Sequence, residues 1–234
     1  MIRHIACLAL LLAFSGTCLA DDPPDSEVNP RTGFIETVTT IWNGSNHAVR
    51  LTIDRGALPP VTAQVATGTT DDLGPRIAIA SSGKVSVVWT RDGSTGQVLV
   101  RARTASGWGS NRPVSDPSEN SRNPELVYDG VATRVVYEIH GASSKSVAVS
   151  IIGDEPDPIS TRKIVATGAW TGDLDARIQA EAGHVWITWV HDGWEVGWSE
   201  LTGSGAWTTA AYESYSGGDI DSACSLIRES VLGL

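Results

Sequence analysis

Lys84-Val-Ser-Val-Val-Trp89 predicts the fold class, because its pattern returns three more times along the chain. Each related run is rich in β-branched residues, five or six residues long, and ends on an aromatic, which is typical of a strand. The closing aromatics lie 47, 48 and 52 residues apart. A period of this length predicts a repeat architecture. The other three runs are Thr37-Val-Thr-Thr-Ile-Trp42, Thr133-Arg-Val-Val-Tyr137 and His184-Val-Trp-Ile-Thr-Trp189.

Three further strands per repeat come into register around these runs. An innermost strand precedes the run, as in Pro75-Arg-Ile-Ala-Ile-Ala80, and two strands follow it, as in Gln97–Arg103 and Asn111–Ser115. Turn-forming Gly, Ser, Asp and Asn separate them. Each repeat is therefore predicted to be a four-stranded antiparallel meander, in an all-β chain.

The two ends of the chain carry a circular offset of this pattern. The polar, proline-containing lead at residues 21–33 predicts no innermost strand before the first run. The segment Asp219-Ile-Asp-Ser-Ala-Cys224 resembles the approach to an innermost strand at Asp72-Leu-Gly-Pro-Arg-Ile77. We therefore predict that the C-terminal strand Ser222–Ile227 joins the N-terminal blade beside Thr37–Trp42. This closes a small four-bladed β-propeller over residues 34–234 and removes two sheet edges. An open array or a β-sandwich accounts for the repeats less well.

Residues 1–20 have the layout of a secretory signal peptide. Arg3 precedes an apolar run from Ile5 to Phe14, and Cys18-Leu-Ala20 supplies small residues before the expected cut. Lipidation at Cys18 is the less favoured alternative, because Thr17 is larger than the residue usual there. The mature protein is expected to be secreted or periplasmic. It is not expected to be an integral membrane protein, since no apolar run reaches the roughly 20 residues that a spanning helix needs.

The formal charge of −10 predicts no nucleic-acid partner, because an acidic surface repels the phosphate backbone. Cys224 is the one cysteine left after removal of the signal peptide, so no disulfide within the mature chain is expected.

The blade pattern resembles the bacterial sialidase-like, or BNR (Asp-box), β-propeller superfamily. The resemblance rests on Pro75-Arg-Ile-Ala78, on Val85-Ser-Val-Val-Trp89, on Val98-Leu-Val-Arg-Ala-Arg103 and on Gly107-Trp108. It covers most of the mature chain as a blade pattern and implies a propeller fold.

The catalytic motifs of that superfamily are not matched. The segments nearest to an Asp-box, Thr104–Trp108 and Thr202–Trp207, lack its aspartate. The resemblance implies an arginine triad, a Tyr/Glu pair and an acidic aspartate in an active sialidase. Only Arg76 and Arg177 stand at equivalent blade positions, so sialidase activity is not expected.

Polar residues recur in the loops that lead into the innermost strands. Aligning these loops gives two columns two residues apart, a spacing that places both on one side of an extended strand. Ring closure would gather five carboxylates near one end of the axis, and oxygen-rich clusters suit Ca²⁺. The favoured alternative is that these aspartates cap turns. The first column is Asp72, Ser121, Asp173 and Asp219, and the second is Gly74, Asn123, Asp175 and Asp221.

Charged and aromatic residues supply the predicted ligand site on the same face. Arg76, Glu125 and Arg177 follow one step further along the innermost strands, where an ion-pair network is favoured over a site in which the two arginines bind an anion. A second loop set brings an exposed indole beside hydrogen-bonding groups, as a sugar-binding loop would. The predicted ligand residues are Arg76, Arg91, Asp92, His140, Arg177, His191, Asp192 and Trp194.

The sequence therefore predicts an exported binding module for glycans or another small polar ligand. It carries no nucleophile elbow, phosphate loop or Cys-x-x-Cys pair, so an enzyme is the second choice. That alternative is a polysaccharide-active hydrolase or lyase using acidic, His or Tyr residues on the same face. A protein-interaction scaffold is the third choice, and would show a large exposed apolar patch. Asn43-Gly-Ser45 fits a glycosylation sequon, but a tight turn is favoured.

Overall fold

The computed structural model of the chain describes residues 23–66, 68–153, 159, 162–168, 174–191 and 195–214, without the side chains of residues 191, 213 and 214. Every regular element within these residues is a β-strand. None of the described residues belongs to a helix long and apolar enough to cross a membrane.

The strands form four antiparallel sheets in chain order. The first contains β1 (Asp25–Val28), β2 (Ile35–Trp42), β3 (His47–Arg55) and β4 (Leu58–Ala66). The second contains β5 (Asp72–Ile79), β6 (Val85–Arg91), β7 (Gln97–Thr104) and β8 (Gly107–Trp108), with β9 (Arg112–Pro113) also paired to β7. The third contains β10 (Ser121–Tyr128), β11 (Thr133–His140), β12 (Lys145–Ile152) and β13 (Lys163–Gly168). The fourth contains β14 (Arg177–Glu181), β15 (His184–His191), β16 (Glu195–Glu200) and β17 (Ala211–Ser214).

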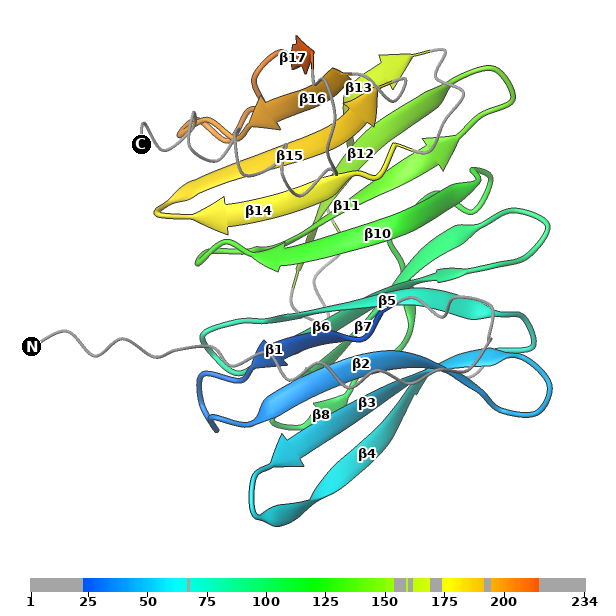
Figure 1. Cartoon of the computed structure of the whole chain (residues 1–234), viewed down its shortest axis with the longest axis vertical. Helices are drawn as coiled ribbons and strands as arrows, with labels where there is room; N and C mark the ends of the chain where they lie inside the picture. The colour runs from blue at the N-terminus through cyan, green and yellow to red at the C-terminus, as the bar shows by residue number, and fades with distance from the viewer. Residues whose placement is uncertain are drawn as a thin grey trace, which may run out of the picture.

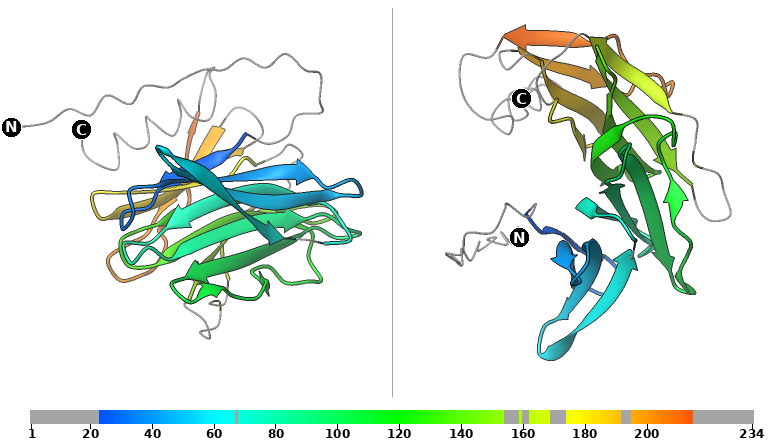
Figure 2. Two further views of the ribbon diagram at one scale, coloured as in Figure 1. Left: turned by 90° about the horizontal axis from the view of Figure 1, so that it is seen from below. Right: turned by 90° about the vertical axis from the view of Figure 1, so that its right-hand side faces the viewer.

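These sheets are the four blades of a β-propeller. They follow one another around an arc, with the innermost strands β1, β5, β10 and β14 in sequence along its inner side (Figures 1 and 2). The predicted fold class and the four-stranded meanders are confirmed. Closure of the ring by Ser222–Ile227 stays a prediction, because those residues lie outside the described part of the chain.

Buried aromatic residues fill the space between successive blades. Trp89, Tyr137 and Trp189 are all fully buried, and each packs against the aliphatic side chains of the preceding blade. Dense packing of this kind makes each blade depend on its neighbour, because one blade alone cannot cover its apolar face.

The first repeat departs from this pattern. Trp42 forms the last pair of its hairpin, opposite His47, whereas Trp89 and Trp189 stand two residues before the last pairs of theirs. At this place at the end of the hairpin, Trp42 is 61% exposed. The sequence alignment of Trp42 with Trp89 is therefore wrong, and so is the interpretation of Trp42 as a residue packed between blades.

The first blade also has an innermost strand of its own. β1 pairs with β2 from Asp25 opposite Val38 to Val28 opposite Ile35. Its polar side chains hid it in the sequence, because the carboxylates of Asp25 and Glu27 accept hydrogen bonds from backbone N–H groups of β5 at 2.8 and 3.2 Å. The expectation that this blade lacks an innermost strand is therefore wrong, and β1 occupies half of the edge that Ser222–Ile227 was predicted to fill.

Candidate functional site

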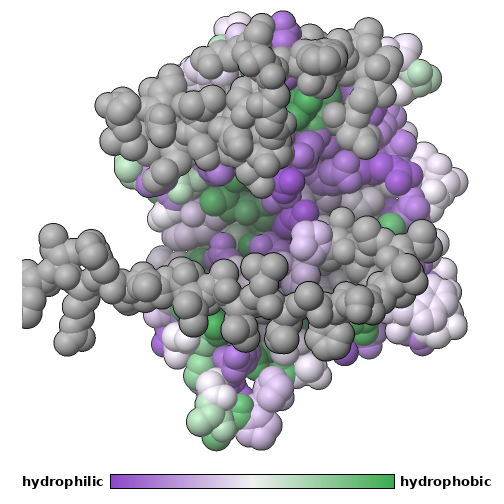
Figure 3. Space-filling view, in the orientation of Figure 1, coloured by the Kyte–Doolittle hydropathy of each residue, from purple (hydrophilic) through white to green (hydrophobic). Residues whose placement is uncertain are grey.

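A pocket of roughly 560 Å³ opens where the innermost strands of the second, third and fourth blades begin. Arg76 of β5, Glu125 of β10 and Arg177 of β14 line it, together with the loops that lead into these strands. On the face seen in Figure 3, hydrophilic side chains gather in the middle of the molecule beside a smaller hydrophobic area. The pocket therefore combines the concavity and the polar groups of a small-molecule site.

The charged side chains of the pocket form one network. Arg76 donates from Nε to Oε1 of Glu125 at 2.8 Å, and Arg177 donates from Nη1 to the same oxygen at 2.6 Å. Nη2 of Arg177 lies 3.0 Å from Oδ1 of Asp175. The ion-pair network that the sequence favoured is present, and the two arginines meet through the carboxylate between them. The ligand-binding role of Arg76 and Arg177 stays a prediction.

The local backbone explains why these strands begin as they do. Gly74, Asn123 and Asp175 all have left-handed backbone conformations, with φ of 58°, 51° and 42°. The strand registers of β5 and β10 shift just there, as at a β-bulge. Glycine, asparagine and aspartate tolerate this conformation best. The second aligned column is therefore explained by backbone geometry at these three positions, which supports the turn interpretation over a metal site.

Asp72 of the first column is an internal anchor. Its side chain is fully buried and accepts hydrogen bonds from Trp89 Nε1 at 2.9 Å and from Arg91 Nε at 2.8 Å. A second bond from Arg91 Nη2, at 3.1 Å, makes the pair bidentate. The predicted metal residue Asp72 and the predicted ligand residue Arg91 are thus bonded to each other.

The predicted Ca²⁺ cluster is not assembled among the described residues, which contain no group of three or more His, Cys, Asp or Glu suited to a metal ion. Asp175 pairs with Arg177 instead. Asp173, Asp219 and Asp221 lie outside the described residues, so Ca²⁺ binding by them stays a prediction.

The remaining predicted ligand residues fall into two groups. Asp92 pairs with Arg122 at 3.0 Å, and His140 Nε2 lies 2.7 Å from Oε2 of the fully buried Glu138. The side chain of His191 and the residues Asp192 and Trp194 lie outside the described part, so their role stays a prediction.

Sequence reasoning missed two residues that line the pocket. Glu125 was aligned with Arg76 and Arg177 but was not counted as a ligand residue, although a carboxylate between two guanidinium groups orients both of them. Arg122 lines the pocket beside Glu125. Its signal was its place one residue after Ser121 in an aligned loop.

Comparisons with known proteins identify the fold. No protein-family model and no curated protein matches this chain. Among solved structures, Trypanosoma rangeli sialidase in complex with the inhibitor DANA has a TM-score of 0.54 at 11% identity, over 79% of this chain and 37% of that one. Fructan 1-exohydrolase IIa from Cichorium intybus has a TM-score of 0.54 at 10% identity, over 78% and 42%. Xylan β-1,4-xylosidase from Bacillus halodurans C-125 has a TM-score of 0.50 at 11% identity, over 84% and 42%.

The chain therefore has a sialidase-like β-propeller fold. The matched part corresponds to about two-fifths of the length of each of these three proteins. At such low identity the likeness defines the fold and leaves the function to be argued from the site.

Proposed function

We propose that the mature chain is an exported glycan-binding module that takes its ligand in the pocket of Arg76, Glu125 and Arg177. The observation that carries this proposal is the convergence of three charged side chains, from three successive blades, on one concave site. Guanidinium groups donate and carboxylates accept, so together they match hydroxyl groups, which do both. Export is part of the proposal and rests on the signal-like residues 1–20.

The fold supports a glycan as the ligand by analogy. The names of the three similar structures describe enzymes that act on glycans. Because propellers host unrelated activities, this analogy only raises the expectation for one class of ligand.

The ion pairs of the pocket carboxylates favour binding over hydrolysis. A typical glycosidase uses two carboxyl groups, one of which gives a proton to the leaving group. Among the described residues, the two carboxylates that line the pocket are Glu125 and Asp175, and both pair with Arg177. These groups are therefore placed to hold arginines in position and to accept hydrogen bonds from a ligand.

Calorimetric titration of the processed protein with sialyllactose, xylohexaose and an inulin-type fructan oligosaccharide tests the proposal. We expect saturable binding of at least one of these sugars with no release of products during prolonged incubation. Release of shorter sugars would favour the hydrolase alternative. Absence of binding to all three at millimolar concentration would refute the glycan proposal.

A further inference from the structure

An exposed tryptophan stands at the end of the first hairpin, in the blade that contributes neither arginine nor glutamate to the pocket network. Trp42 closes β2 opposite His47, which opens β3. Trp42 is 61% exposed, and its indole meets the His47 ring edge-on, with centroids 5.1 Å apart. The core does not contain this side chain, since Trp42 lies at the hairpin end, beyond the register of the buried Trp89 and Trp189.

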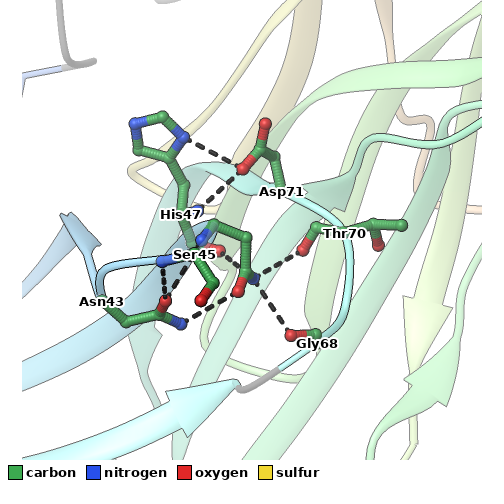
Figure 4. Close-up of polar contacts among 7 residues, drawn as sticks. Asn43, Ser45, His47, Gly68, Thr70 and Asp71 are labelled. Atoms are coloured by element: carbon green, nitrogen blue, oxygen red, sulfur yellow. Dashed lines mark hydrogen bonds and ion pairs between the residues drawn. The ribbon is translucent and has the colours of Figure 1, made fainter.

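The hairpin loop that follows Trp42 is held by a network of amide groups. Asn46 is 8% exposed, and its Nδ2 group donates to the carbonyls of His47, Gly68 and Thr70 at 2.9–3.0 Å (Figure 4). Asn43 completes the turn, because its Oδ1 accepts from the backbone N–H groups of Ser45 and Asn46. The predicted tight turn is confirmed. The network joins the first hairpin to the loop between β4 and β5 and so fixes the direction of the neighbouring side chains.

His47 is oriented by an acidic partner on that second loop. Oδ1 of Asp71 accepts from the His47 backbone N–H at 2.7 Å and lies 3.1 Å from Nδ1 of the ring. These bonds lower the pKa of Asp71, the backbone bond contributing most. The two side chains stay partly exposed, at 32% for His47 and 41% for Asp71. Figure 4 shows the other ring nitrogen of His47 and the second oxygen of Asp71 pointing away from the loop.

We propose that Trp42, His47 and Asp71 form a second glycan-binding site, which stacks a pyranose ring of a neutral oligosaccharide on the Trp42 indole. The proposal rests on the proposed function, because it names a second contact for the same class of ligand. An indole offers a flat apolar surface for the C–H groups of a sugar ring. The His47 ring contacts the indole and Asp71 is bonded to His47, so the two side chains can supply a donor or acceptor for the ring hydroxyls. Because the loop is already ordered, binding costs little conformational entropy.

The test follows the Trp42 indole directly. In ¹H–¹⁵N spectra of the processed protein, the cross-peak lost in Trp42→Phe assigns the Trp42 indole. Titration with cellohexaose and with xylohexaose should move this cross-peak in a saturable way. Trp42→Ala should weaken the binding that this movement accompanies about tenfold, as measured by calorimetry, whereas Trp42→Phe should retain most of it. Val131→Ala, at an exposed apolar residue of the third blade, is the matched control and should bind as the original protein does.

The outcomes separate this site from the central pocket. A Trp42 cross-peak that does not respond to either sugar, or a Trp42→Ala variant with unchanged affinity, overturns the second site. If Glu125→Gln then still weakens sugar binding, the proposed function stands without it. If the Trp42 cross-peak responds and Glu125→Gln has no effect, the second site stands and the pocket is refuted. Asp71→Asn should weaken binding only severalfold, because the amide oxygen of the asparagine can still accept the hydrogen bond from the His47 backbone N–H and so keep His47 in place.

Discussion

Arg177 on the fourth blade donates a 2.6 Å hydrogen bond to Oε1 of Glu125 on the third blade. The Arg76 guanidinium of the second blade shares that acceptor. Three blades are thus joined at their innermost strands by one carboxylate. The same residues line the pocket, so the proposed ligand binding and the blade-to-blade contact share one group.

Removal of that carboxylate should therefore lower stability as well as binding. Glu125→Ala leaves two guanidinium groups facing each other, and we expect a loss of about 1–3 kcal/mol in the free energy of unfolding after allowing for partial exposure. Thermal unfolding should then begin several degrees lower. Glu125→Ala combined with Arg76→Ala should lose less than the sum of the single variants. Strict additivity would mean that the pair contributes nothing.

The buried Asp72 should behave as an anchor. Asp72→Ala leaves Trp89 Nε1 and the Arg91 guanidinium without their acceptor, and we expect a loss of about 3–5 kcal/mol. Asp72→Asn should cost less, because its amide oxygen can still accept from Trp89. Urea unfolding followed by tryptophan fluorescence measures both. Addition of Ca²⁺ should shift the two variants and the original protein alike, and a Ca²⁺ response that only the variants lose would assign Asp72 to a metal site.

Two tryptophans test the corrected register of the first blade. Trp42→Ala should change the free energy of unfolding by no more than about 0.5 kcal/mol, since the indole is exposed. Trp89→Ala should cost about 3–5 kcal/mol, because it opens a cavity between the first two blades. Equal losses would restore the original alignment of Trp42 with Trp89.

Asp129 should make stability fall in acid. Burial alone would raise its pKa, but hydrogen bonds from the backbone N–H groups of Ala132 and Val131 and from Arg134 together lower it below its ordinary value of 3.8. A depressed folded-state pKa stabilises the protein above the unfolded-state value, and this contribution disappears as pH falls through the folded-state value. Asp129→Asn should therefore be less stable at pH 7, and the difference should shrink below about pH 4. Denaturant unfolding across this range measures the effect.

Glu27 should show the opposite sign. Burial raises its pKa above 4.5, the bond from the Ile79 N–H opposes the rise, and Asp25 adds to it. The charged form is therefore disfavoured in the folded state. The stability that Glu27 contributes is present below its unfolded-state pKa and is lost as pH rises through its folded-state pKa. Glu27→Gln keeps an acceptor for Ile79 and should be as stable as the original protein, or slightly more stable, at pH 7. A clear loss at neutral pH in thermal unfolding would contradict this account.

The repeat was readable from sequence because interblade packing demands it. Trp89, Tyr137 and Trp189 must fill equivalent spaces, so they recur at a fixed period. Trp42 also ends a β-branched run, so in sequence it resembles these aromatics. In the structure it is exposed and does not pack between blades. β1 was hidden because Asp25 and Glu27 satisfy backbone groups of the next blade, which makes an inner strand look like a polar leader.

The site was only half readable for a different reason. Arg76 and Arg177 stand out as charges on inner strands, but the residue that joins them is 49 and 52 positions away and is set by blade geometry. Two members of the aligned column Gly74, Asn123 and Asp175 are polar, so in sequence the column resembles a metal or ligand site. Its common property is a backbone angle, and a residue name does not show that angle directly.

The proposal that the ligand binds in the Glu125 pocket is tested by comparing the dissociation constants of two variants. Calorimetry should compare Glu125→Gln with Glu200→Gln, which alters a carboxylate paired with His184 on the fourth blade, away from the pocket. With whichever sugar binds the original protein, we predict that Glu125→Gln weakens binding at least about tenfold, equivalent to about 1.4 kcal/mol, and that Glu200→Gln leaves it unchanged. Equal dissociation constants for the two variants would contradict the claim.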